Sequence, residues 1–445
     1  MAGRYKAYPE YKDSGVEWLG NIPEYWNSKA LKFLCTYNDE ALSETTDPDT
    51  EIEYIDIGSV SAIEGISKTE KIIFSKSPSR ARRIVRDGDV IVSTVRTYLE
   101  AISPIVNPPE NLIVSTGFAV IRPSSQLDKG FAAYCLRAKG FIREVVARSG
   151  GVSYPAINAS ELVNIKIPSL PYQEQQTIAN FLDHEIAKID TLIAKQKKLI
   201  ELLQEKRQAV ISHAVTKGLN PDVRMKDSGV EWLGEVPEHW VVKSYRYACK
   251  IYRGKFGHRP RNDPAFYDGK YPFIQTGDVA RAGKYIEEYK QTLNDRGVSV
   301  SQKFPIGTLM MAIAANIGDT AILGFEAYAP DSVVGFKPKS DIDLEFLRYS
   351  LMAALPALEQ TSTQSTQANL NIDRIGAVQA SFPSISEQNE IVSYLDFLLE
   401  QYDNVESKSI KSIELMRERK TALISAAVTG KIDVRDWQEL IEKQG

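Results

Sequence analysis

Two long segments of the chain repeat apolar residues every three to four positions, with Glu, Lys and Gln common between them. Residues 173–216 contain no Gly or Pro, and residues 387–429 carry a comparable apolar stripe. This spacing predicts two amphipathic helices with a coiled-coil-like seam, each roughly 60 Å long at 1.5 Å per residue. Gly218 and Gly430 predict where the helices end. The stripe positions are Leu182, Ile189, Leu192, Leu199, Leu203 and Val210 in the first segment, and Ile391, Leu395, Leu398, Tyr402, Val405, Met416 and Leu423 in the second.

The segments outside the two helices are typical of compact mixed α/β domains. Residues 27–170 and 241–383 contain short β-rich runs punctuated by Gly and Pro, which predicts a curved sheet in each domain and leaves the strand order open. The predicted β runs are 53–57, 89–95, 112–121, 308–314 and 321–325, and the predicted helical patches are 130–148 and 344–358.

A long helix with a one-sided apolar stripe needs a partner to cover that stripe. The simplest partner for each long helix is the other long helix. Antiparallel pairing of two tandem copies would place the globular domains at opposite ends, related by an approximate two-fold axis. The alternative is a core helix buried inside each globular domain.

The whole pattern occurs twice, which predicts a duplicated chain with pseudo-two-fold symmetry. Residues 11–26 (YKDSGVEWLGNIPEYW) and 225–240 (MKDSGVEWLGEVPEHW) agree at twelve of sixteen positions with an offset of 214. The globular segments match more weakly, at an offset of 219, and they have diverged far more than the long helices. In the helices, at an offset of 213, Glu174-Gln175 and Asp183 match Glu387-Gln388 and Asp396.

The charge distribution is more informative than the net charge of −4, which taken alone argues against nucleic-acid binding. Seven basic residues lie between Lys71 and Arg96, and seven more lie between Lys243 and Arg261 without any acidic residue. This pattern suits DNA contact confined to two places, although solvated faces are the alternative. Three widely spaced cysteines and the lack of a long apolar run favour a reducing cytoplasm, without a membrane span.

The duplicated order of motifs resembles the specificity subunits of type I restriction–modification systems, over residues 11 to 430. Three motifs carry the resemblance: the Lys-Asp-Ser-Gly-x-x-Trp-Leu-Gly-x-x-Pro-x-x-Trp opening, a Tyr-Ile-x-Ile-Gly-like strand, and a Pro…Glu-Gln-x-x-Ile-x-x-x-Leu-Asp entry to each long helix. The second entry departs from the first, because Pro383 and Glu387 are two residues closer together than Pro168 and Glu174.

The resemblance implies a DNA-recognition subunit of mixed α/β fold with no catalytic site and no directly bound cofactor. Two target-recognition domains would each read one half of a split, asymmetric double-stranded DNA sequence, and antiparallel helices would set the spacing. Two methylation subunits with S-adenosylmethionine, and two restriction/translocase subunits with ATP and Mg²⁺, are the implied partners. The implied domains are 1–26, a repeat segment; 27–170, the first recognition domain; 171–218, the first helix; 219–240, the second repeat segment; 241–383, the second recognition domain; 384–430, the second helix; and 431–445, a tail.

Exposed basic and amide side chains are the candidates for DNA contact. Arg and Lys beside phosphates release counterions, whereas forked donors and amides read base edges. Gly254 and Gly257 would let their loop approach the DNA backbone, and the polar run 361–371 is either a base-reading loop or a linker. The phosphate candidates are Arg80, Arg82, Arg83, Arg86, Arg253, Lys255, Arg259 and Arg261. The base-reading candidates are Arg96, Thr97, Tyr98, Ser153, Tyr154, Gln364 and Gln367.

Patterns for catalysis or metal binding are weak in this sequence. Residues 107–110 (Asn-Pro-Pro-Glu) lack the aromatic residue that amino-methyltransferases stack on a flipped base, so a turn is expected. Asp222 with Asp268-Gly269-Lys270 loosely resembles a nuclease pattern, but residues 267–270 are expected to form a tight turn. The four histidines are scattered, and no metal site is expected. Trp18, Trp26, Trp232 and Trp240 are expected to anchor the repeat segments against the helices instead of stacking on bases.

Two alternative functions stay open on the sequence alone. One is a stand-alone DNA restriction or methylation enzyme with an unrecognised active site. The other is a coiled-coil adaptor that binds proteins and no DNA.

Overall fold

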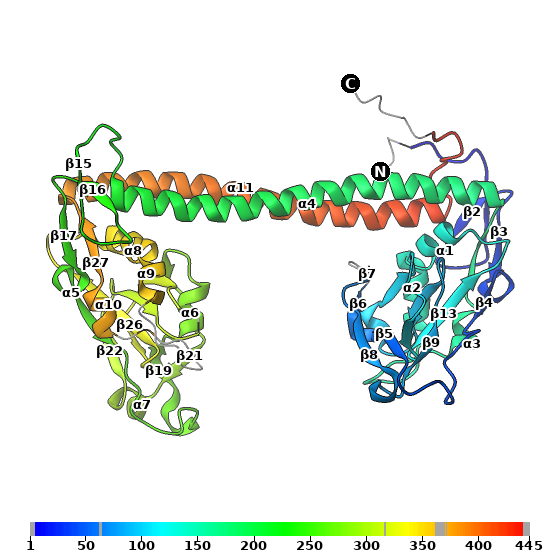
Figure 1. Ribbon diagram of the computed structural model, residues 1–445, viewed down its shortest axis with the longest axis horizontal. Helices are drawn as coiled ribbons and strands as arrows, with labels where there is room; N and C mark the ends of the chain where they lie inside the picture. Colours follow the sequence, from blue (N-terminus) through cyan, green and yellow to red (C-terminus); the bar gives the residue numbers. More distant parts are fainter. Residues whose placement is uncertain (1–4, 62–64, 316, 361–369, 371, 439–445) are drawn as a thin grey trace. The chain divides into compact units, whose positions relative to one another are not determined.

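The structure, a computed structural model, describes residues 5–61, 65–315, 317–360, 370 and 372–438. The chain forms two compact units (Figure 1): unit 1 comprises residues 1–196 and 410–445, and unit 2 comprises residues 197–409. Each unit therefore holds one globular domain and a part of each long helix. None of the described helices is long and apolar enough to cross a membrane.

The globular domain of unit 1 contains two four-stranded sheets, of order β11-β10-β13-β4 and β8-β5-β12-β9, with β5 and β12 parallel. Strand β10 alternates its side chains between two cores: Val90 and Val92 pack with helices α1 and α2, and Ile91 faces the second sheet. The elements are β1 (Tyr11–Asp13), β2 (Asn21–Pro23), β3 (Asn27–Ala30), β4 (Cys35–Tyr37), β5 (Glu51–Ile55), β6 (Val60–Ser61), β7 (Gly65–Ile66), β8 (Glu70–Ile73), β9 (Ala81–Ile84), β10 (Val90–Ser93), β11 (Ile102–Pro104), β12 (Leu112–Ser115), β13 (Phe118–Pro123), α1 (Lys129–Cys135), α2 (Lys139–Ala147), α3 (Ala159–Leu162) and β14 (Lys166–Ser169).

The globular domain of unit 2 repeats this architecture with a five-stranded sheet, β18-β26-β23-β24-β20, and a four-stranded sheet, β21-β19-β25-β22. Strand β23 alternates as β10 does: Leu309 and Met311 face the helix-covered core, and Met310 faces the other sheet. The elements are β15 (Met225–Asp227), β16 (Glu235–Pro237), β17 (Val241–Ser244), α5 (Tyr245–Ala248), β18 (Cys249–Arg253), β19 (Tyr267–Phe273), α6 (Thr276–Arg281), β20 (Tyr285–Ile286), β21 (Gln291–Leu293), α7 (Asp295–Ser299), β22 (Gln302–Phe304), β23 (Leu309–Ala312), β24 (Thr320–Leu323), β25 (Ala327–Ala329), β26 (Val333–Pro338), α8 (Leu344–Ala353), α9 (Leu355–Gln360), α10 (Ile372–Ala377) and β27 (Gln379–Phe382).

The predicted mixed α/β domains and their duplication are confirmed, with three differences in detail. The run 112–121 is two strands, and each predicted helical patch is two short helices; in the first patch, Ala138 has an extended backbone (ψ 136°) that ends α1 before α2 begins. The expected tight turn at residues 267–270 is wrong. These residues lie in β19, where Asp268 adopts a positive φ of 59° and the register shifts between Tyr267 and Tyr271.

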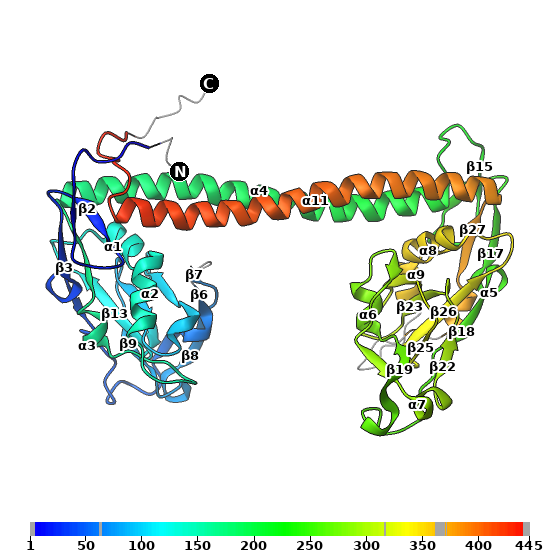
Figure 2. The same ribbon diagram turned by 180° about the vertical axis from the view of Figure 1, so that it is seen from behind.

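The two long helices are confirmed and pack antiparallel within each unit (Figures 1 and 2). Helix α4 spans Tyr172–Lys217 and helix α11 spans Ile385–Val428. In unit 1, Lys420 donates to Asp190 at 2.8 Å, and in unit 2, Arg207 forms an ion pair with Asp403. Gly218 and Gly430 follow the helices with positive φ, as their sequence positions predict.

The predicted stripes are buried mainly where the globular domains also cover the helices. Leu182 and Ile189 lie in the core of unit 1, and Leu395 lies in the core of unit 2. The helix pair does not cover the whole stripe, because Leu192 and Leu199 are exposed. A single partner helix covers only a narrow seam, so these apolar side chains remain accessible on the helix pair.

Each Glu-Gln…Asp motif attaches a globular domain to its helix. The Gln175 amide donates to the Gln126 and Leu170 carbonyl oxygens and accepts from the Asp128 N–H at 2.8 Å. Gln388 makes the equivalent three bonds in unit 2. The motif recurs because its side chains satisfy buried backbone groups at this junction.

The four repeated tryptophans anchor the repeat segments, as predicted. Trp26 and Trp240 are almost fully buried, and their indole N–H groups donate to Oε1 of Glu174 and Glu387 in the first turns of α4 and α11. Trp18 and Trp232 donate to backbone carbonyl oxygens on β14 and β27.

Candidate nucleic-acid interface

Two candidate base-reading loops of the first domain meet in space although 57 residues separate Arg96 from Ser153. The Arg96 guanidinium lies 5.2 Å from the ring centroid of Tyr154, a cation–π contact. A backbone bridge joins Val95 to Ala156, and the N–H of Ile157 donates to the carbonyl oxygen of Thr94 at 2.9 Å. The first loop is therefore held against the second by backbone pairing as well as by the cation–π contact.

The side chains of this loop pair face solvent, with one exception. Tyr154 is 68% exposed, and Arg96, Tyr98 and Ser153 are also exposed. Thr97 is buried, and its hydroxyl donates to Oγ of Ser149 at 2.8 Å. These contacts support a role for Thr97 in positioning the loop that carries Arg96 and Tyr98.

Two apolar residues at this surface were not predicted from the sequence. Leu99 follows Tyr98 and is exposed, and Val152 precedes Ser153 and is fully exposed. Aliphatic side chains of this kind contact thymine methyl groups in DNA complexes. Nothing in the hydrophobic pattern marks them, because an isolated Leu or Val in a mixed stretch looks like a core position.

The first basic stretch divides into exposed and protein-bound arginines. Arg80 is exposed in the turn before β9. Arg82 lies over the Phe74 ring at 4.7 Å, and Arg86 forms an ion pair with Glu40 at 2.6 Å while staying 65% exposed. Arg83 is half-buried, and burial lowers the pKa of its guanidinium. Arg80 and Arg86 are thus the exposed members of this stretch, and of the two only Arg86 is shown in an ion pair.

The DNA-contact candidates of the second basic stretch lie at the end of β18 and in the loop that follows. Arg253 and Lys255 are exposed. Arg261 makes a two-pronged ion pair with Asp331 at 2.6 Å, and Arg259 lies 3.6 Å from the same carboxylate. The carboxylate aligns the two guanidinium groups at the surface and partly neutralises them.

Packing within the protein explains why residue 254 is a glycine. A Cβ at this position would lie 2.6 Å from the carbonyl oxygen of Val333, which is too close for any other residue type. A Cβ at Gly257 would be 3.6 Å from the carbonyl oxygen of Val300, an ordinary contact. Of the remaining base-reading candidates, Gln364 and Gln367 lie outside the residues that the structure describes. Over the described parts of the chain, no cluster of His, Cys, Asp or Glu has metal-binding geometry.

Fold and surface together define a duplicated protein that couples two mixed α/β domains to paired helices and exposes basic and aromatic loops suited to DNA. A family model for the type I restriction modification DNA specificity domain matches residues 23–202 and 237–415. Since the match covers most of the sequence, the chain belongs to this family. As the DNA specificity subunit of a type I restriction–modification system, it is itself non-catalytic.

Similar proteins cover most of the chain. The putative type I restriction enzyme MjaX specificity subunit of Methanocaldococcus jannaschii is 24% identical over 436 residues, covering 94% of this chain and 96% of that protein. The EcoKI specificity subunit of Escherichia coli K12 is 21% identical over 339 residues, covering 72% and 68% of the two chains.

Solved structures share the fold. A chain from a type I R-M system, solved to describe complex assembly and conformational transition, has a TM-score of 0.73 at 21% identity, covering 92% of this chain and 99% of that one. The HsdS subunit from Thermoanaerobacter tengcongensis has a TM-score of 0.53 at 22% identity and covers 92% of this chain and 98% of its own.

Proposed function

We propose that the two globular domains each read one half of a bipartite, asymmetric double-stranded DNA sequence, with recognition domains at 27–170 and 241–383. The observation that carries this proposal is the meeting of Arg96 and Tyr154 on one exposed surface. An arginine there can donate two hydrogen bonds to a guanine edge, and the tyrosine beneath it restrains the guanidinium. Tyr98 and Ser153 complete the base-reading set of the first domain, and Thr97 positions its loop.

In the second domain, we assign base reading to Gln364 and Gln367 and phosphate contact to Arg253, Lys255, Arg259 and Arg261. Phosphate contact in the first domain falls to Arg80, Arg82, Arg83 and Arg86. Exposure of Arg80, Arg253 and Lys255 supports this assignment, because a cation must reach the DNA backbone to displace counterions.

The partners in this proposal are two methylation subunits, which bind S-adenosylmethionine, and two restriction/translocase subunits, which use ATP and Mg²⁺, all in the cytoplasm. Exposed apolar side chains on the long helices support a protein-binding role. Helix α4 exposes Leu192, Leu199 and Leu202, and helix α11 exposes Ile410 and Leu415. Side chains of this kind, repeated along a helix, mark a surface that a partner covers.

The test is to express the chain with its methylation subunits, methylate random DNA and determine the modified sequence by methylation-sensitive sequencing. We expect a motif in two parts separated by unspecified bases. R96A with Y154A should relax one part and leave the other unchanged. Relaxation of both parts, or of neither, would contradict the assignment of these residues to one half-site.

Two further assays separate the alternatives. Methylation or cleavage by the purified chain alone, with S-adenosylmethionine and Mg²⁺, would indicate a stand-alone enzyme. Absence of any DNA footprint in the presence of the methylation subunits would indicate an adaptor that binds only protein.

A further inference from the structure

The internal repeat allows two equivalent sites, one in each unit, to be compared residue by residue. Each lies at the first turn of a long helix, where a glutamate accepts a hydrogen bond from a buried tryptophan: Glu174 from Trp26 at 3.2 Å in unit 1, and Glu387 from Trp240 at 3.0 Å in unit 2. The two carboxylates therefore have the same helix position and the same indole donor. The residues that surround the two carboxylates differ between the two units.

Backbone pairing shows which residues occupy equivalent positions near the two glutamates. Two matching hydrogen bonds set the register: Glu24 N–H to Glu10 C=O at 3.1 Å in unit 1, and Glu238 N–H to Arg224 C=O at 2.8 Å in unit 2. The offset of 214 between these pairs makes Tyr25 equivalent to His239 and Tyr8 equivalent to Asp222. Tyr8 thus has no aromatic counterpart in the second copy.

In unit 1, the chain's own terminal segments fill the site. Tyr8 is buried and donates its hydroxyl hydrogen to Oε1 of Glu174 at 2.7 Å, and Tyr25 donates to the same oxygen at 2.8 Å. The Arg435 guanidinium lies over both rings, 5.0 Å from Tyr8 and 5.7 Å from Tyr25. A phenol and an adjacent cation are therefore the chemical groups that complete the site around this glutamate.

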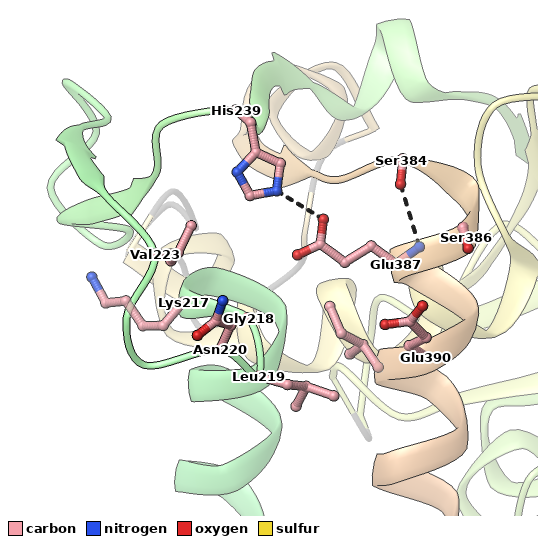
Figure 3. A pocket seen from close by; sticks show the side chains of 11 residues that line it. Lys217, Gly218, Leu219, Asn220, Val223, His239, Ser384, Ser386, Glu387 and Glu390 are labelled. Atoms are coloured by element: carbon pink, nitrogen blue, oxygen red, sulfur yellow. Dashed lines mark hydrogen bonds and ion pairs between the residues drawn. The ribbon is translucent and has the colours of Figure 1, made fainter.

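In unit 2, the equivalent space is a cavity of about 350 Å³ (Figure 3). Asn220, Val223, His239, Glu387 and Glu390 are among the residues that line it. The second carboxylate oxygen of Glu387 is 2.9 Å from Nε2 of His239. Asp222, which replaces Tyr8, is exposed and is not among the residues that line the cavity. The position that a phenol occupies in unit 1 is thus left open among the described residues of unit 2.

The difference continues along the same face of α11. Residues 387, 390, 394 and 397 follow helical spacing and form one stripe, which we call the α11 face. In unit 1, Phe181, the counterpart of Tyr394, is 1% exposed, because Tyr5 packs on it at 5.4 Å and Trp437 at 5.9 Å. In unit 2, Tyr394 is 43% exposed and Phe397 is 64% exposed.

The charge of the cavity restricts what can cover the α11 face. Glu387 and Glu390 contribute two carboxylates, and the Lys217 ammonium is turned to the carbonyl oxygens of Leu233 and Glu235. A DNA phosphate would be repelled here, whereas a phenol hydroxyl and a basic side chain match the site. Exposed aromatic residues next to such a cavity favour a protein segment.

We propose that an aromatic, basic segment of a partner protein covers the α11 face of unit 2, with a tyrosine hydroxyl in the cavity donating to Glu387. This segment would take the place that Tyr5, Tyr8, Arg435 and Trp437 take in unit 1. The chain's two copies thus carry the same receptor site, one filled from within and one open to a partner.

The experiment measures binding of a synthetic peptide with the sequence of residues 5–11, Tyr-Lys-Ala-Tyr-Pro-Glu-Tyr, to the full chain by fluorescence anisotropy. We expect saturable binding at one site per chain. Replacing Tyr8 of the peptide with Phe should weaken binding at least fivefold. In the chain, D222Y places a tyrosine at the position equivalent to Tyr8 and should weaken peptide binding at least tenfold.

A control variant keeps the result unambiguous. D222N removes the same charge without filling the cavity and should bind the peptide as the unmodified chain does.

Three outcomes would overturn the proposal. Binding that persists unchanged in D222Y would place the peptide elsewhere, for example in unit 1 in exchange for the chain's own segment. No saturable binding at millimolar peptide would show that the cavity does not receive a tyrosine. Self-association of the chain that D222Y abolishes in sedimentation experiments would make a second copy the occupant.

Discussion

The hydroxyl of Tyr349 donates a 2.6 Å hydrogen bond to Oδ1 of Asp396, and this contact joins helix α8 of the second globular domain to helix α11. Tyr134 makes the same 2.6 Å bond to Asp183 on α4 in unit 1. Burial and the neighbouring carboxylate both raise the pKa of these phenols. The duplicated aspartate of the helix motif is therefore a structural receptor for a tyrosine of the domain it supports.

We expect Y349F to lower the free energy of unfolding of unit 2 by about 1–2 kcal/mol, because it leaves a partly buried carboxylate without its phenol donor. Y134F should have a similar effect on unit 1. Chemical denaturation of the full chain measures both changes. Y247F is the matched control, since Tyr247 is exposed, and a loss as large as that of Y349F would show that the hydrogen bond to Asp396 is not the cause.

Asp396 should make stability depend on pH in the acidic range. Burial alone would raise the pKa of this carboxyl, but hydrogen bonds from Lys284 at 2.7 Å and from Tyr349 lower it overall. A folded-state pKa below the unfolded value of about 3.9 contributes stability at higher pH, which is lost as the pH falls through the folded pKa. The stability difference between the unmodified chain and D396N should therefore shrink as the pH is lowered from 6 to 3. A constant difference over this range would contradict the assignment.

Gly430 is required by both its backbone conformation and its neighbours. Its φ is +70°, and an added Cβ would lie 2.7 Å from Cγ of Pro23. G430A should destabilise unit 1 by more than the about 1–2 kcal/mol that a left-handed conformation alone costs. Gly15 is the matched control, because its φ is +64° but no described atom lies within 4 Å of a Cβ there. Equal thermal shifts for G430A and G15A would show that crowding by Pro23 contributes nothing.

Replacement of Arg96 should affect sequence discrimination more than general DNA affinity. We expect R96A to weaken binding to cognate DNA by about 1–3 kcal/mol, the discrimination that a bidentate arginine–guanine contact provides, with a smaller change for unrelated DNA. Y154A should act in the same direction, because it removes the ring that restrains the guanidinium. Competition binding with the methylation subunits present measures both. Equal losses on cognate and unrelated DNA would instead indicate a phosphate contact.

The arginines of the first basic stretch should control the salt dependence of binding. Joint replacement of Arg80, Arg82, Arg83 and Arg86 with Ala should weaken DNA binding and reduce the log–log salt slope, by about 0.9 for each phosphate that is no longer neutralised. R80A should account for a larger part of the change than R83A, because Arg80 is exposed and Arg83 is half-buried. An unchanged slope in the fourfold variant would exclude this stretch from the DNA interface.

Most of the fold could be predicted from the repetition and the periodicity of the sequence. The Glu-Gln…Asp motifs and the four tryptophans recur because each makes hydrogen bonds that hold a domain or a repeat segment in place. Such local requirements can be recognised in the sequence. The basic stretches could also be recognised in the sequence, but which of their arginines bind other side chains could not. Arg86 pairs with Glu40, 46 residues away, and no local sequence pattern indicates that pairing.

The duplication, the two long helices and their glycine ends could be predicted from the order of residues, because helical period and glycine conformation depend on neighbouring residues only. The folded structure was needed to show that Arg96 meets Tyr154, that Thr97 turns inward, and that Tyr8 fills in one copy a site that stays open in the other. Those relationships depend on the path of the chain between distant residues. Burial and contact at such points arise from packing of the whole unit, which the order of residues specifies only through the folded state.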